Sequence, residues 1–153
     1  MRLFLHDQNP ERRKAILAAL AEGAVQPEVL VSADTVRGLS ALSGAAAGHL
    51  PLLLGQDDGT LALVAGLRRA GAENAILVVA DRRQADRDAG LLDAGVCDVT
   101  ALPLHAGELA ARLRAAMRRR KAISSRSASS LTIRRPAMAI CVPARRLRRA
   151  RKF

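Results

Sequence analysis

Short apolar segments alternate with segments of helical period along the first 120 residues. The apolar segments cover residues 2–5, 28–31, 50–54, 75–80 and 96–102. Their starts lie 21 to 26 residues apart. Between them, apolar side chains recur at three- and four-residue spacing, as at Ile16, Leu17 and Leu20, which is typical of an amphipathic helix. The pattern predicts five strand–helix units.

Capping residues agree with this division. Asn9 is placed to cap the first helix, with Pro10 at its first position, and Gly23, Gly71 and Gly95 stand where three helices should end. Pro103 follows the fifth strand. The segment 34–48 is rich in Ala, Gly and Ser, so its helix is the most weakly indicated of the five.

The strands themselves indicate the kind of sheet. Residues 50–54 and 75–80 are almost continuously apolar, as strands are when both faces of a parallel sheet are covered by helices. Right-handed crossovers then give an α/β, flavodoxin-like (βα)5 fold with a doubly wound parallel sheet. In such a sheet, functional groups are expected at the carboxyl ends of the strands.

Charge divides the chain into two parts. The net charge is +11, but residues 1–117 carry 12 basic and all 14 acidic residues, whereas residues 118–153 carry the other 13 basic residues and no acid. We therefore expect a near-neutral domain over residues 1–120, followed at 121–153 by a basic linker and a tail of low order, with at most a turn of helix near residues 144–152.

Several function classes are disfavoured. Cys97 and Cys141 have no paired spacing, so we expect free thiols and neither a disulfide nor a CxxC site. No apolar run approaches the ~18 residues of a membrane span, and we expect a cytoplasmic protein with no membrane contact. Glycine spacings match no phosphate-binding loop, and His49 and His105 are isolated, so we expect no cofactor and no enzymatic activity.

Two stretches carry a family resemblance. Residues 1–9, MRLFLHDQN, followed by a capped helix, and residues 99–119, with Pro103, Glu108 and Arg112, resemble the receiver domain of bacterial two-component response regulators. The last helix is most similar to that of the winged-helix, OmpR-like transcription factors. The resemblance covers about residues 1–120 and implies phosphoryl transfer to an aspartate at the end of the third strand.

The reactive positions that this resemblance implies are mostly lost. The acidic pair after the first strand falls on Asp7 and Gln8, the phosphoacceptor on Gly55, the hydroxyl on Ala80 and the lysine on Leu102, and the aromatic switch residue becomes Val99. Phosphoryl transfer needs a carboxylate nucleophile, further acids for Mg²⁺ and a cation for the phosphate. We therefore interpret the domain as a pseudo-receiver with a degenerate phosphorylation pocket.

Neighbouring acids leave alternatives open. The loop after the third strand is about four residues short, so Asp57 or Asp58 could take the vacant phosphoacceptor place. His6, Asp7, Asp57 and Asp58 could converge as metal ligands, but we favour an empty, solvated acidic mouth and expect no metal. The mixed charges at residues 81–88 are expected on the exposed face of the fourth helix.

The tail resembles the start of a missing domain. Residues 118–121 continue the fifth helix, 124–130 indicate a flexible linker, and 129–133 are similar to the first strand of a winged-helix effector. The remaining 20 residues are too few for that effector, which we interpret as missing or truncated. A frame change near residue 134 in a GC-rich gene would give the same composition. The alternative is an arm that binds nucleic-acid phosphates through Arg134, Arg135, Arg145, Arg146, Arg148, Arg149, Arg151 and Lys152.

The sequence therefore predicts an atypical response regulator in two-component, phosphorelay signal transduction. It would act by protein–protein interaction without phosphorylation. The expected surface comprises the fourth helix, fifth strand and fifth helix, with Arg112, Arg114 and Arg118 facing a protein partner or a second copy. The alternative is a transcriptional regulator or non-specific DNA-binding protein that uses the basic tail.

Overall fold

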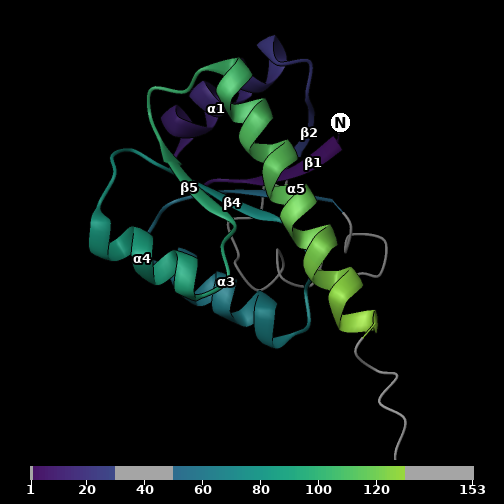
Figure 1. The fold of residues 1–153 in the computed structure, drawn as a ribbon. Coiled ribbons are helices and arrows are strands. Elements are labelled where there is room, and N and C mark those ends of the chain that lie inside the picture. Colours follow the sequence, from purple (N-terminus) through teal and green to yellow (C-terminus); the bar gives the residue numbers. More distant parts are fainter. Residues whose placement is uncertain (1, 30–49, 130–153) are drawn as a thin grey trace, which may run out of the picture.

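The computed structural model describes residues 2–29 and 50–129, which form a three-layer α/β unit (Figure 1). The strands are β1 (Arg2–His6), β2 (Gln26–Val29), β3 (Leu52–Gly55), β4 (Ile76–Ala80) and β5 (Asp98–Ala101). They pair in parallel in the order β2-β1-β3-β4-β5. The prediction of a flavodoxin-like parallel sheet is confirmed.

Three described helices connect strands, a fourth follows the last strand, and together they cover both faces of the sheet. They are α1 (Pro10–Glu22), α3 (Thr60–Arg69), α4 (Ala85–Asp93) and α5 (Ala106–Ser129). Helices α1 and α5 lie on one face, and α3 and α4 on the other (Figure 1). The helix expected at residues 34–48 lies outside the described residues.

Two apolar layers explain why the central strands β3 and β4 are almost continuously apolar. Leu53, Leu77 and Val79 belong to the core beneath α1 and α5. The alternate residues, among them Leu54 and Val78, belong to the core beneath α3 and α4. Because successive side chains of a strand point to opposite faces, a strand covered on both sides must be apolar at every position.

The helix boundaries follow the expected caps. The Asn9 side chain accepts hydrogen bonds from the backbone N–H groups of Glu11 and Arg12, with Pro10 at the first position. Gly71 and Gly95 have positive φ angles of 82° and 104° just beyond α3 and α4, a conformation that favours glycine. Gly23 caps α1, but the positive φ there belongs to Ala24.

Helix α5 is longer than the sequence predicts. It continues through Ser129, so the expected flexible linker from residue 124 is wrong over residues 124–129. Once a helix is nucleated by packing, each further residue adds a hydrogen bond at little cost, and Ala favours the helix while Ser opposes it only weakly. The 1–120 boundary of the domain stays a prediction. No described helix is long and apolar enough to cross a membrane.

Candidate functional site

Three adjacent strands bring together the residues that lie at or directly after their carboxyl ends. Strand β1 leads into Asp7, β3 ends at Gly55, and β4 leads into Asp81. β1 and β4 both pair with β3, so these three positions lie on adjacent strands. Asp7 and Gly55 belong to the degenerate phosphorylation pocket that the sequence predicts, and Asp81 directly follows Ala80, another predicted position of that pocket.

A buried ion pair occupies the centre of this edge. Arg12, in the first turn of α1, binds both oxygens of Asp7, with Nε 2.7 Å from Oδ2 and Nη2 2.8 Å from Oδ1. The Asp7 side chain is fully buried and that of Arg12 is only 3% exposed. Asp7 Oδ1 also accepts a hydrogen bond from the backbone N–H of Asn9 at 2.9 Å. Bidentate guanidinium–carboxylate pairs of this kind are among the strongest hydrogen-bonded contacts in proteins.

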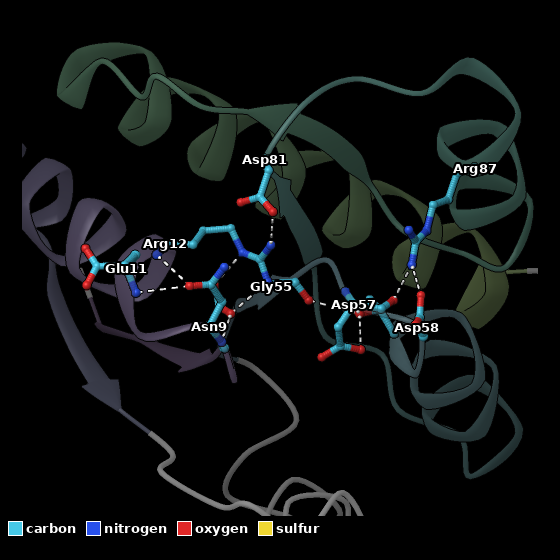
Figure 2. Close-up of polar contacts among 10 residues, drawn as sticks. Asn9, Glu11, Arg12, Gly55, Asp57, Asp58, Asp81 and Arg87 are labelled. Carbon is cyan, nitrogen blue, oxygen red and sulfur yellow. Dashed lines mark hydrogen bonds and ion pairs between the residues drawn. The ribbon is translucent and has the colours of Figure 1, made fainter.

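Arg12 reaches a second carboxylate on the far side. Its Nη1 lies 3.2 Å from Oδ2 of Asp81, whose side chain is 60% exposed (Figure 2). Burial acts to lower the pKa of Arg12, but the hydrogen bonds and negative charge of Asp7, followed by those of Asp81, outweigh it and raise the pKa above its ordinary value. The guanidinium therefore stays charged and links α1, the end of β1 and the segment after β4.

Gly55 makes room for this pair. A Cβ atom built on Gly55 would overlap the carboxylate of Asp7, closer than real Cβ atoms come to any other atom. The position that the resemblance assigns to the phosphoacceptor thus has no side chain and no space for one. Asp7, which the resemblance implies as half of a Mg²⁺-binding pair, has both oxygens engaged by Arg12.

The two neighbouring aspartates have other contacts. Asp57 Oδ1 accepts the backbone N–H of Gly59 at 2.8 Å and lies 3.0 Å from the hydroxyl of Thr60, at the start of α3. Asp58 pairs with Nη2 of Arg87 in α4 at 3.1 Å (Figure 2). Neither side chain replaces the missing group at Gly55.

An open cavity of about 290 Å³ follows the carboxyl ends of β1 and β3 and is lined by His6, Gln8, Asp57, Asp58, Gly59 and Leu63. Of the acids expected to converge, the structure thus brings Asp57 and Asp58 near His6 and Gln8, while Asp7 turns away toward Arg12. The described part of the chain holds no group of three or more His, Cys, Asp or Glu side chains arranged for a metal ion.

The remaining pocket positions are apolar and packed. Ala80 is the last residue of β4 and is fully buried, and Leu102 packs against the core beneath α1 and α5. Val99, at the position of the aromatic switch residue, is buried in the other core. None of these side chains carries a hydroxyl, ammonium or aromatic group.

The charged run before and within α4 differs from its prediction. Asp88 is buried, and its Oδ2 accepts from Nε of Arg83 at 2.6 Å, while Arg83 Nη1 donates to the backbone oxygen of Val99 at 2.8 Å. Residues 81–84 precede α4, which begins at Ala85. Residues 81–87 are exposed, as expected, but the expectation is wrong in two respects: residues 81–84 do not belong to α4, and Asp88 is buried.

Sequence reasoning missed Arg12, the central residue of the site. The available signal was an arginine in the first turn of a helix that starts directly after an acidic residue, combined with a glycine at the end of β3. The basic residues proposed for nucleic acid, Arg134 to Lys152, lie outside the described residues.

Comparison with known structures places this geometry in a known fold. An orphan response regulator of H. pylori, HP1043, is similar with a TM-score of 0.57 and 20% identity, covering 76% of this chain and 96% of that one. A response regulator receiver domain protein from Clostridium thermocellum gives a TM-score of 0.64 at 11% identity, covering 80% and 98%. No protein-family model and no curated protein matches the sequence.

A third similar structure is an atypical orphan response regulator, described as having a phosphorylation-independent regulatory mechanism. It gives a TM-score of 0.59 at 21% identity and covers 77% of this chain and 96% of that one. At these identities the likeness defines the fold alone. The described residues therefore have the receiver fold, and the receiver-like prediction is confirmed at that level.

Proposed function

We propose that this protein is an atypical receiver-like regulator in two-component signalling that works by protein contact and is not phosphorylated. The observation that carries the proposal is the buried Asp7–Arg12 pair beside Gly55. The sequence resemblance to the OmpR-like class adds the expectation that the α4, β5 and α5 face makes the protein contacts.

Three chemical requirements of aspartyl phosphorylation are unmet in this pocket. No carboxylate extends from the end of β3, because the space belongs to Asp7. Both oxygens of Asp7 already bind a guanidinium, which competes with any divalent cation for the same lone pairs. No lysine follows β5, since Leu102 stands there, to neutralise a phosphate.

Incubation with acetyl phosphate and Mg²⁺ is expected to leave the intact mass of the protein unchanged, because no free carboxylate meets these requirements. Mass spectrometry of the whole chain measures this directly. A typical phosphorylatable receiver domain serves as the positive control. An added phosphoryl mass that maps to Asp57 or Asp58 and is lost in base would contradict the proposal.

An ion-pair network joins β5 and α5 within the proposed contact face. Arg112 of α5 donates to Asp98 of β5 at 2.7 Å and pairs with Glu108 one turn earlier, also at 2.7 Å. The hydrogen bonds with Asp98 and then Glu108 raise the pKa of Arg112, so this cation stays charged. Arg112 therefore joins β5 to α5, and the exposed Leu92 side chain of α4 is left to meet a protein partner.

A second copy of the chain is the partner to test first. Leu92→Glu on α4 is expected to weaken self-association at least about tenfold, because it places a charge in an apolar contact. A tenfold change in the dissociation constant corresponds to about 1.4 kcal/mol. Leu61→Glu on α3 is the matched control, because Leu61 is 49% exposed and Leu92 45%, but α3 lies outside the proposed face. Sedimentation velocity over a concentration series measures both variants. Equal weakening by the two substitutions, or a parent that stays monomeric, would contradict this form of the proposal.

A further inference from the structure

The distal half of α5 carries a dense positive charge that no described carboxylate neutralises. Glu108 is the last acidic residue of the chain, and Arg118, Arg119, Arg120 and Lys121 follow one another within the helix. The exposed Arg114, Arg118, Arg119 and Lys121 form no ion pair within the described residues, and we call these four the α5 basic group. Arg114, Arg118 and Lys121 share one face at i, i+4 and i+7.

This half of the helix is also unsupported by apolar packing. Leu109, Ala110, Leu113 and Ala116 are buried against the body, and no later residue of α5 whose exposure is described is buried. At ~1.5 Å per residue, the helix runs on for about 20 Å past Ala116. Figure 1 shows these last turns extending beyond the sheet.

Positively charged side chains lie near one another at the point where α5 extends past the sheet. Arg120 lies near Arg68, and burial, followed by the positive charge of Arg120, lowers the pKa of Arg68. Nε of Arg120 is shielded from solvent and has no hydrogen-bond partner. Like charges at helical spacing destabilise a helix by a few tenths of a kcal/mol per pair, so an anionic ligand that neutralises them would stabilise it.

We infer that the α5 basic group binds the phosphate backbone of duplex nucleic acid without reading its sequence. Arginine and lysine are among the side chains that most often contact phosphates, and the α5 basic group supplies four of them on exposed positions of one helix. A membrane surface fits less well, because Met117 and Ile123 are the only large apolar side chains on residues 117–129 and aromatic residues are absent there. The same lack of aromatic residues favours a duplex over a stacked single strand.

The test compares two equal losses of charge in the full-length chain. One variant carries Arg114→Gln, Arg118→Gln, Arg119→Gln and Lys121→Gln, and glutamine preserves helix propensity. The matched control carries Arg145→Gln, Arg146→Gln, Arg148→Gln and Arg149→Gln in the tail. Fluorescence anisotropy with a short labelled duplex of arbitrary sequence, at about 50 to 200 mM salt, gives the slope of log affinity against log salt. Circular dichroism checks that both variants are folded.

The α5 variant is expected to reduce that slope by about 3.6, from ~0.9 for each of four phosphate contacts, and the tail variant by less than half as much. Hydrogen exchange should also slow at residues 117–129 when the duplex is added. Three results would overturn the inference: an unchanged slope in the α5 variant, a loss in the tail variant as large as in the α5 variant, or tighter binding to polyglutamate or phosphatidylserine vesicles than to the duplex.

Discussion

Gly55→Asp, which supplies the carboxyl group that a phosphoacceptor needs, is expected to destabilise the protein by about 3 kcal/mol or more and to add no phosphoryl mass. The new Cβ would overlap the Asp7 carboxylate, so either the strand must shift or Asp7 must leave Arg12. Overpacking alone costs about 1 to 3 kcal/mol, and breaking a buried ion pair costs about 3 to 5 kcal/mol. Urea unfolding followed by circular dichroism measures the loss.

Two controls separate steric overlap from a general effect of replacing glycine. Gly66→Ala within α3 meets no atom within 4 Å, so it should stabilise the protein by about 0.5 to 1 kcal/mol through helix propensity. The double variant Asp7→Ala, Gly55→Asp removes the overlapping group and keeps one carboxylate at this edge as a countercharge for Arg12, so it should recover part of the stability lost in Gly55→Asp. Equal stability of parent and Gly55→Asp would show that Asp7 does not occupy this space.

Arg12→Met is expected to destabilise the protein by about 3 to 5 kcal/mol, because it leaves the fully buried Asp7 carboxylate without its countercharge. Lys14→Met, two residues later on an exposed position of α1, should change stability by no more than about 0.5 kcal/mol. Pairing Arg12→Met with Asp7→Asn should cost less than the two single changes together, since no unpaired charge stays buried.

The pH dependence of the pair follows from the direction of the Arg12 shift. A raised pKa in the folded state means that the contribution of Arg12 is complete below its ordinary pKa and is lost only as the pH rises through the folded value. The difference in unfolding free energy between the parent and Arg12→Met, measured with urea, should therefore stay constant from pH 6 to pH 9, because the Arg12 guanidinium does not titrate in this range. A deficit that shrinks steadily toward pH 9 would contradict this assignment.

Much of the fold could be predicted because strand burial is a local signal. Residues 75–80 are apolar on both faces, and the structure has β4 at Ile76–Ala80. The register that assigns Gly55 to the end of β3 follows from the same kind of run. The caps at Asn9 and Gly95 were also predictable, since each acts on its immediate neighbours.

The chemistry of the pocket depends on contacts that a sequence pattern does not contain. Arg12 and Asp81 are far apart in sequence and meet only because α1 and β4 reach the same edge of the sheet. Asp88 looks like an exposed helical acid until Arg83 and the packing of α4 bury it. A charged residue looks the same in the sequence whether it is buried or exposed, and only its three-dimensional surroundings distinguish the two cases.

The overlap at Gly55 also restricts how this pocket could change by mutation. The buried Asp7 carboxylate requires Arg12 as its countercharge. Position 55 requires glycine as long as the Asp7 carboxylate fills the space next to it. A single substitution at either position is therefore expected to cost about 3 kcal/mol or more, a large fraction of the ~5 to 15 kcal/mol that holds a typical domain folded. Strong epistasis follows: an aspartate at position 55 becomes acceptable only in a background where position 7 has already changed. The effects of substitutions at these three residues on stability are therefore expected to depend strongly on one another.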